Sequence, residues 1–138
     1  MSPDAVSITY QRETRPYSEE VAAVYRSAGL RRPVDDLSRI EQMIEHGNLI
    51  ITARHDGRLV GVSRSLTDFC YCCYLSDLAV HADYQRHGIG KELVRLTREA
   101  IGPKSMLLLL AAPSADGYYP HLGFEAVPNG WIIHRTEQ

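Results

Sequence analysis

The alternation of apolar and polar side chains along the chain predicts strands and helices in a definite order. Strand patterns, with apolar side chains at every second position or in short runs, occupy residues 6–10, 48–54, 59–66, 69–80, 105–112, 124–127 and 131–135. Helical spacing of apolar side chains between capping residues occupies residues 18–28, 36–47, 88–100 and 113–122. The predicted order is therefore β-α-α-β-β-β-α-β-α-β-β.

Turn and cap residues indicate how these elements begin and end. Ser18 is expected to cap the first helix, and Asp35 or Asp36 the second. Asp56 and Gly57 predict a tight hairpin turn between the second and third strands. The stretch 69–80 is long enough to carry a β-bulge. The continuous apolar run 105–112 predicts a strand buried on both faces, which follows a helix in a right-handed parallel crossover.

Length and composition fit one globular domain over residues 1–138. Hydrophobic residues make up 44% of the chain and charged residues 23%, which is ordinary for a folded domain. A formal net charge of -2 argues against nucleic acid as a partner. No apolar stretch approaches the ~18 residues of a membrane span, and the first residues lack the features of a signal peptide. We therefore expect no membrane partner and a cytoplasmic location.

Three cysteines lie close together at positions 70, 72 and 73. Their number is odd, their spacing differs from that of zinc sites, and neighbours in a strand point to opposite faces. We expect small, buried, reduced side chains and no metal.

The residues that organise the chain form a glycine-bearing loop between a strand and a helix. Gly88 and Gly90 stand at the start of that helix, where unpaired main-chain N–H groups and the helix dipole favour an anion such as a phosphate. A Walker loop is excluded by Gln85 and Glu92, and a dinucleotide fingerprint by Leu93, where those motifs need other residues. A tight turn without a ligand is the alternative for such glycines.

The sequence Gln-Arg-His-Gly-Ile-Gly, after a strand that ends in Leu-Ala-Val, resembles the coenzyme A loop of the GNAT superfamily of acyl-CoA N-acyltransferases. The resemblance implies an α/β (α+β) fold with a mixed, mostly antiparallel sheet of about seven strands flanked by about four helices. It also implies that acetyl-CoA is the co-substrate. The residues expected to hold its pyrophosphate are Gln85, Arg86, His87, Gly88, Ile89, Gly90 and Lys91. Those expected to pair with its pantetheine arm are Leu78, Ala79 and Val80.

A second motif, Tyr-Tyr-Pro-His-Leu-Gly-Phe at residues 118–124, resembles the segment of the same family that carries a tyrosine near the acetyl-CoA sulfur. By that resemblance Tyr119 is the general acid, because a phenol can protonate the departing coenzyme A thiolate. Packing on a short helix is the alternative for this tyrosine. Tyr118 is the weaker candidate, since neighbouring helical positions face about 100° apart.

The sequence offers no carboxylate at the position where the family places the base for the acceptor amine. Many family members use a Glu early in the fourth strand, and the matching position here holds Tyr74. Asp77 is the nearest acid, as a base acting through water or as a substrate-binding residue. Alternation places it on the face opposite Tyr74 unless a bulge intervenes, and a structural carboxylate is an equal alternative.

The acceptor and the assembly are open at this stage. Arg12, Arg31 and Arg32 lie where the family forms a wall of the acceptor cleft, and either select a carboxylate or form a solvated basic face. Residues 59–64 and 77–80 are similar to bacterial and plant relatives of arylalkylamine acetyltransferases, which suggests a small amine. Residues 131–133 carry an apolar Trp-Ile-Ile run that fits either a homodimer contact or core packing.

We therefore expect an N-acetyltransferase that moves acetyl from acetyl-CoA to a primary amine of a small molecule, by direct attack in a ternary complex and without metal. The alternatives are a protein or peptide amine acetyltransferase and a non-catalytic acyl-CoA-binding module.

Overall fold

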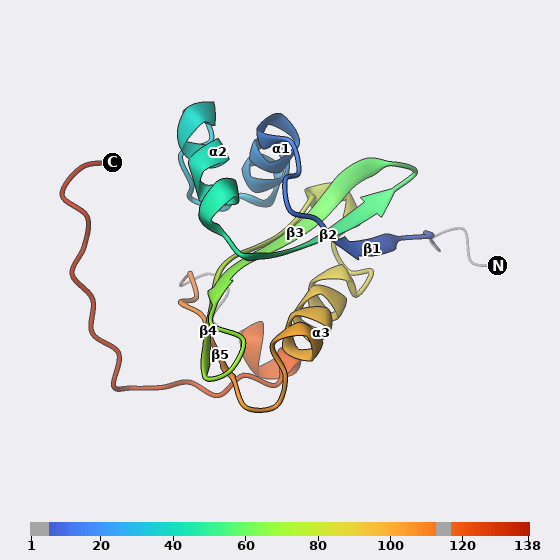
Figure 1. Cartoon of the computed structure of the whole chain (residues 1–138). Helices are drawn as coiled ribbons and strands as arrows, with labels where there is room; N and C mark the ends of the chain where they lie inside the picture. Colours follow the sequence, from blue (N-terminus) through green and yellow to red (C-terminus); the bar gives the residue numbers. More distant parts are fainter. Residues whose placement is uncertain (1–5, 113–116) are drawn as a thin grey trace.

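A five-stranded sheet forms the centre of the protein, with helices on both of its faces (Figure 1). The computed structural model describes residues 6–112 and 117–138. The strands are β1 (Thr9–Arg12), β2 (Leu49–His55), β3 (Arg58–Thr67), β4 (Cys72–Val80) and β5 (Met106–Leu108). Within these residues the helices are α1 (Ser18–Ala28), α2 (Leu37–His46) and α3 (Ile89–Ile101), together with the 3-10 helices η1 (Ala82–Tyr84) and η3 (Tyr119–Leu122).

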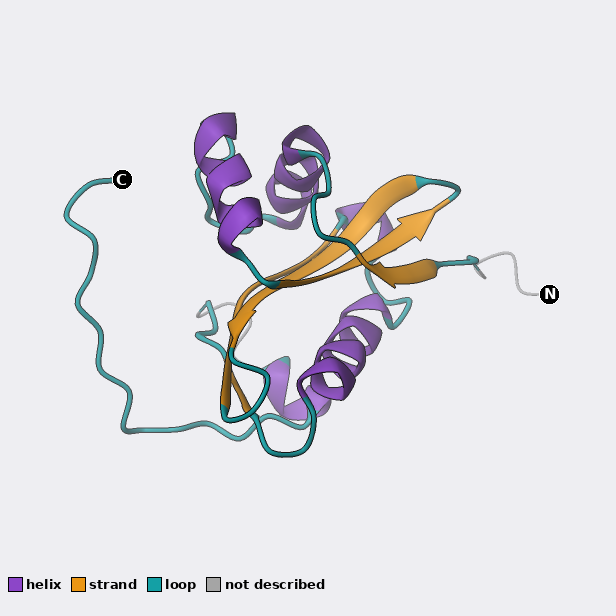
Figure 2. Ribbon diagram, viewed as in Figure 1, coloured by secondary structure: helices purple, strands orange, loops and turns teal. Residues whose placement is uncertain are grey.

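The strands follow one another across the sheet in sequence order. The pairs from β1 to β4 are antiparallel, and β5 runs parallel to β4 after the crossover through α3. Helices α1 and α2 cover one face, and α3 covers the other (Figure 2). The predicted parallel crossover is therefore confirmed, because two parallel neighbours need a connection that crosses the sheet.

Two apolar clusters hold these layers together, one on each face. Between the sheet and helices α1 and α2, the buried side chains are Val21, Val24, Tyr25, Ile40, Ile44, Ile50, Leu59, Val62 and Ala79. Between the sheet and α3 they are Leu49, Ile51, Ala53, Val60, Cys73, Ile89, Leu93 and Ile101. Because both faces of the sheet are covered, β2 and β3 are buried over most of their lengths, including the polar side chains of Thr52, Ser63 and Arg64.

The helix ends agree with the sequence at most positions. Helix α1 ends at Gly29, which adopts the left-handed conformation with φ 73°. The carboxylate of Asp36 caps α2 by accepting a hydrogen bond from the Arg39 N–H at 3.1 Å. The prediction for Ser18 is wrong, because Tyr17 holds the cap position of α1 and its side chain makes no capping bond. The hairpin is as predicted, with φ of 50° at Asp56 and 83° at Gly57.

The carboxy-terminal third of the chain departs from the prediction. Strand β5 has three residues rather than eight, and Met106 and Leu108 are exposed rather than buried on both faces. Residues 124–127 and 131–135 form no strand, and the tail from residue 124 runs away from the sheet (Figure 1). A strand pattern needs a neighbour that supplies hydrogen bonds, and β5 itself pairs with β4 over only three residues.

Three smaller predictions also need correction. The first strand covers residues 9–12 rather than 6–10. The fourth helix is only the 3-10 helix η3, and the part of the prediction over residues 113–116 lies outside the described residues. Cys70 and Cys72 are exposed, and only Cys73 is buried. Asp68 explains this difference, because its Oδ1 accepts the N–H groups of residues 70–72 and delays the start of β4.

Candidate functional site

The edge of β4 is open where the second half of the strand continues past β5. Strand β5 pairs with β4 only from Cys72 to Tyr74, and β4 extends to Val80. Residues 78–80 pair with β3 on one side, and no described strand pairs with their other side. Gln85 donates a hydrogen bond from Nε2 to the Val80 carbonyl at 3.2 Å. The remaining main-chain groups of this edge can pair with an extended amide chain.

The loop after β4 brings the chain to the start of α3 with two residues in the left-handed conformation. These are Arg86, with φ 69°, and Gly88, with φ 77°. Gly88 holds the cap position of α3, and no side chain caps this end of the helix. The first N–H groups of a helix have no partner within it, so the start of α3 offers donors and a positive dipole to an anion.

Most of the loop is open to solvent. Gln85, Arg86, His87, Gly88 and Lys91 are exposed, whereas Ile89 and Gly90 are buried. A Cβ added to Gly88 would meet no atom within 4 Å. Five of the seven predicted phosphate-binding residues are therefore open to solvent.

Gly90 is needed for a different reason, which the sequence did not reveal. A Cβ at this position would overlap the hydroxyl of Tyr118, and its third neighbour is a methyl group of Val80. The Tyr118 hydroxyl therefore lies against the first turn of α3. Sequence reasoning ranked Tyr118 below Tyr119, and nothing in the motif spacing indicated this contact.

Tyr119 lies in an aromatic cluster at the start of η3. Its ring packs edge-on against Tyr118, with 5.4 Å between centroids, and against Phe124, with 5.7 Å. Burial raises the pKa of the Tyr119 phenol, Tyr118 raises it further, and the positive charge of Arg32 opposes both. The phenol therefore keeps its proton at neutral pH and can act as a donor.

Asp77 is fully buried and binds two arginines. Its Oδ1 accepts from Arg32 Nε at 2.5 Å, and its Oδ2 accepts from Arg64 Nε at 2.5 Å and from the Tyr25 hydroxyl at 2.9 Å. Burial alone would raise the pKa of Asp77, but the charges and hydrogen bonds of the two guanidiniums lower it. The carboxylate is therefore ionised, and both of its oxygens are occupied.

A β-bulge brings Asp77 to this position. The pairing with β3 shifts between Arg64, opposite Asp77, and Ser65, opposite Leu75, so that Ser76 has no partner. Cys73 consequently packs on the α3 face of the sheet, whereas Asp77 faces α1 and meets Tyr25. The role of Asp77 as a base or a substrate-binding residue stays a prediction, and its contacts fit a residue that holds Arg32 in place.

Two other predicted residues, Tyr74 and Arg12, form no hydrogen bond with Asp77 among the described residues. Tyr74 is 38% exposed. Arg12 donates to the Asn48 carbonyl at 3.0 Å, away from Asp77. Sequence reasoning missed Tyr25 and Arg64. Arg64 could have been found, because it is a charged residue in the middle of a predicted central strand, where a charge is seldom buried without a partner.

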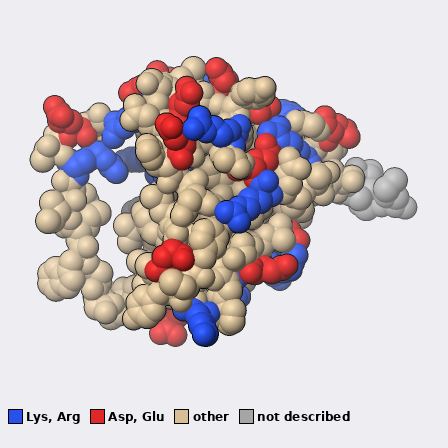
Figure 3. Space-filling model, viewed as in Figure 1, with Lys and Arg blue, Asp and Glu red and all other residues tan. Residues whose placement is uncertain are grey.

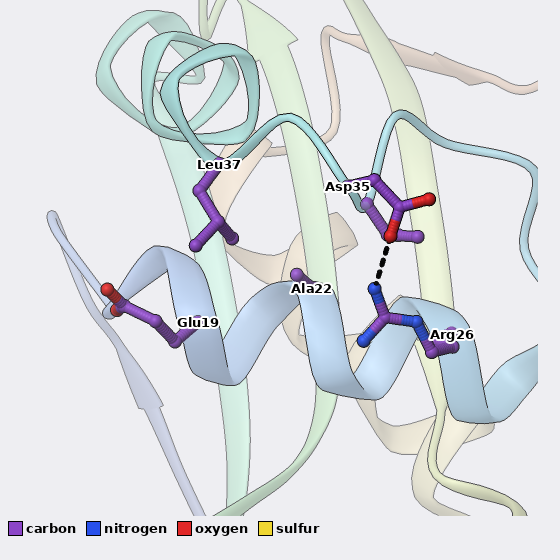
Figure 4. Close-up of a pocket in the computed structure, with 6 residues that line it drawn as sticks. Glu19, Ala22, Arg26, Asp35 and Leu37 are labelled. Atoms are coloured by element: carbon purple, nitrogen blue, oxygen red, sulfur yellow. Dashed lines mark hydrogen bonds and ion pairs between the residues drawn. The ribbon is translucent and has the colours of Figure 1, made fainter.

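A pocket of about 310 Å³ lies between α1 and the start of α2, apart from the predicted loop residues (Figure 4). Its lining includes Ala22, Leu37 and the exposed ion pair between Arg26 and Asp35, with 2.9 Å between Nη2 and Oδ1. None of the predicted site residues lines it. We therefore place the candidate site at the β4 edge and the start of α3, and not in this pocket.

Among the described residues, no group of three or more His, Cys, Asp or Glu side chains is arranged to hold a metal ion. Likewise, none of the described helices is both long and apolar enough to cross a bilayer. Acidic and basic side chains are interspersed on the face shown in Figure 3.

Comparison with known proteins decides the family. The model of the acetyltransferase (GNAT) domain matches residues 46–126, which is more than half of the chain. The chain belongs to the GNAT acetyltransferase family. The match includes β2 to β5, the glycine loop and the Tyr118–Tyr119 motif, so this GNAT domain carries both sequence motifs in the matched region.

Relatives and solved structures agree with this assignment. An uncharacterized N-acetyltransferase, ycf52, from Porphyra purpurea is 30% identical over 109 residues, which are 73% of this chain. The chain spans 60% of that relative's length. A probable acetyltransferase, SA2161, from meticillin-resistant Staphylococcus aureus has the same fold, with a TM-score of 0.82, 20% identity and coverage of 95% of this chain and 100% of its own. Aminoglycoside N-acetyltransferase AAC(6')-Iy, solved in complex with CoA, gives a TM-score of 0.71 at 14% identity, with 99% of each chain covered.

Proposed function

We propose that this GNAT domain transfers acetyl from acetyl-CoA to a primary amine of a small molecule by direct attack in a ternary complex. The proposal rests on two features that follow each other along the chain. These are the open edge of β4 at residues 78–80 and the start of α3 at Gly88, which no side chain caps. An extended arm with amide groups can pair with the first, and a pyrophosphate can bind at the second. The CoA complex of the structurally similar AAC(6')-Iy supports the same ligand.

Tyr119 and Tyr118 supply the acid side of this chemistry. The amine nitrogen attacks the thioester carbonyl and loses a proton to water, and the bond from carbon to sulfur breaks. The departing thiolate takes a proton from a donor that regains it from solvent. Tyr119 is the proposed donor, because burial keeps its hydroxyl protonated. Tyr118 contacts the start of α3, and we propose that it helps to position acetyl-CoA there.

The base side has no carboxylate assigned to it. An amine with a pKa of about 10.4 is neutral in roughly one molecule in a thousand near pH 7.5, equivalent to ~4 kcal/mol. Asp77 is already ionised and bound to two arginines. We propose that the amine enters in its neutral form, with its proton lost to water.

A release assay for the coenzyme A thiol, run over a panel of small amines, peptides and acyl-CoAs, tests this proposal. We expect turnover with acetyl-CoA and at least one small primary amine. Turnover with peptides alone would favour the protein-amine alternative. Tight acetyl-CoA binding without thiol release for any acceptor would favour a non-catalytic module, an alternative that Tyr74 in place of the usual Glu keeps open.

The location and assembly also stay predictions. We retain the cytoplasm as the expected location. A homodimer is proposed on the exposure of Trp131 and Ile133, which are 97% and 98% exposed in the tail. Contact with a second copy would bury these side chains, and gel filtration with light scattering measures the assembly directly.

A further inference from the structure

The buried charges around Asp77 do not balance. One carboxylate faces two guanidiniums, and the side chains of Arg32 and Arg64 are only 26% and 9% exposed. Among the described residues, Asp77 is the one acid that forms an ion pair with either arginine. The group therefore carries one excess positive charge in a partly desolvated place. Such a charge is costly unless an anion compensates it.

Arg32 is held in a fixed orientation with donors to spare. Besides the bond from Nε to Asp77, it donates from Nη1 to the Arg31 carbonyl at 2.6 Å and from Nη2 to the Ser76 carbonyl at 2.7 Å. A guanidinium has five N–H groups, so one N–H remains on each terminal nitrogen. Both remaining donors lie in the guanidinium plane and can bind carboxylate oxygens.

Arg32 also lies beside the proposed reaction centre. It binds the Ser76 carbonyl and Asp77 on β4, just beyond the point where β5 stops pairing with this strand. Its positive charge acts on Tyr119, where it opposes the effect of burial on the pKa of the phenol. An anion bound by Arg32 would therefore lie near the site of acetyl transfer.

We propose that Arg32 binds an anionic group of the acceptor, so that the substrates of this site are amines that also carry a carboxylate. Asp77 and Arg64 act as positioning residues, because they fix the guanidinium of Arg32. This inference rests on the proposed function and adds a substrate class to it. Arg31 is the matched control, because it has the same charge. Its side chain is exposed and forms no hydrogen bond among those of the described residues, which fits the solvated basic face and not the acceptor wall.

The test compares pairs of amines that differ by one carboxylate, namely phenylalanine with phenethylamine and 4-aminobutyrate with propylamine. Kinetics are measured for the wild type, Arg32→Gln, Arg32→Lys and Arg31→Gln. We expect the wild type to favour the carboxylate member by about tenfold or more in kcat/KM. Arg32→Gln should lower kcat/KM for the carboxylate-bearing amine about tenfold, mainly by raising KM. It should change kcat/KM for the neutral amine by less than about threefold. Arg32→Lys should recover part of the loss, and Arg31→Gln should resemble the wild type.

The inference would be overturned if Arg32→Gln lowered kcat/KM equally for both amines of a pair, or if the wild type preferred the neutral amine. Calorimetric titration of phenylalanine and of 4-aminobutyrate, with CoA present, gives a readout that needs no turnover. Binding that Arg32→Gln abolishes, in a protein without turnover, would support the carboxylate site and reject the proposed function. Turnover of neutral amines with no effect of Arg32→Gln on either measurement would reject the site alone. Titration of CoA itself should be unchanged by Arg32→Gln, and a loss there would assign Arg32 to the cofactor and overturn the inference.

Discussion

Tyr119 keeps its proton because burial, with a smaller effect of Tyr118, raises the pKa of its phenol above the ordinary value of 10.0. We expect Tyr119→Phe to lower kcat about a hundredfold or more while acetyl-CoA affinity changes little, because only the departing thiolate uses the proton. Steady-state kinetics and acetyl-CoA titration check both parts.

Tyr118→Phe is the matched control for that variant, since the two rings pack against each other with 5.4 Å between centroids. It should affect acetyl-CoA binding more than kcat. If Tyr118→Phe lowered kcat a hundredfold and Tyr119→Phe did not, Tyr118 and not Tyr119 would be the general acid.

Asp77 contributes stability that depends on pH. Its pKa is lowered below the ordinary 3.8, so the contribution is complete above that value and is lost as the pH falls through the lowered pKa. We expect Asp77→Asn to lower the free energy of unfolding by about 3–5 kcal/mol at neutral pH, because it leaves two arginines without their carboxylate. Urea unfolding at several pH values measures this difference.

Asp35→Asn is the control for Asp77→Asn, because Asp35 also pairs with an arginine but is exposed. We expect it to change the free energy of unfolding by at most about 1 kcal/mol. If the two substitutions cost the same, the buried group around Asp77 does not stabilise the fold as described.

The residues of this network also mark the limit of sequence reasoning. The sequence pointed to Asp77 and Arg32 as charged residues near the acceptor cleft. It indicated that the direction of Asp77 depends on a β-bulge, but not that the bulge forms. Tyr25 falls within the predicted helix 18–28, where spacing indicates only a buried face, yet its hydroxyl donates to Asp77 at 2.9 Å. Periodicity indicates which face a side chain occupies, but not which polar groups meet there.

At the scale of elements, the junction of α3 with the segment before η3 depends on the absence of a side chain at Gly90. We expect Gly90→Ala to lower the free energy of unfolding by about 1–3 kcal/mol, because its Cβ would overlap the Tyr118 hydroxyl. In a Tyr118→Phe background the overlapping atom is gone, and Ala favours a helix over Gly by about 1 kcal/mol. The same substitution should there be neutral or stabilising.

A double-mutant cycle with thermal or urea unfolding measures this coupling. The four proteins are the wild type, Gly90→Ala, Tyr118→Phe and the double variant. Additive effects would mean that Tyr118 does not lie against the first turn of α3.

Elements with strong local signals were predicted well, and those that depend on distant partners were not. Helices α1 to α3, the Asp56–Gly57 hairpin and the parallel crossover follow from caps, spacing and turn chemistry. The last two predicted strands fail, because their patterns are local but their hydrogen bonds would have to come from another strand. Asp68 likewise shortens β4 through bonds to three N–H groups, which no apolar pattern encodes.

At the scale of the whole molecule, the proposed cofactor site and the proposed acceptor site are built from different elements around the sheet. Helices α1 and α2 cover the face that holds Arg32 and Asp77, whereas α3 starts beside the open end of β4 (Figure 1). The proposed cofactor arm lies between β4 and the start of α3, and the proposed acceptor approaches from the side of Arg32. In the proposed reaction, the acyl donor and the acceptor meet where β4 and β5 part.

The most direct test of this account is calorimetric titration of acetyl-CoA into the wild type, Gly88→Ala and Gly29→Ala. Gly88 and Gly29 have nearly the same backbone conformation, with φ of 77° and 73°, and a Cβ at either one would meet no protein atom within 4 Å. The two variants should therefore lose similar stability, whereas only Gly88 borders the proposed pyrophosphate site. We predict micromolar binding to the wild type and Gly29→Ala, and affinity weakened by about tenfold or more in Gly88→Ala. A folded wild type that does not bind acetyl-CoA, or equal affinities of the two variants, would contradict the proposed cofactor site.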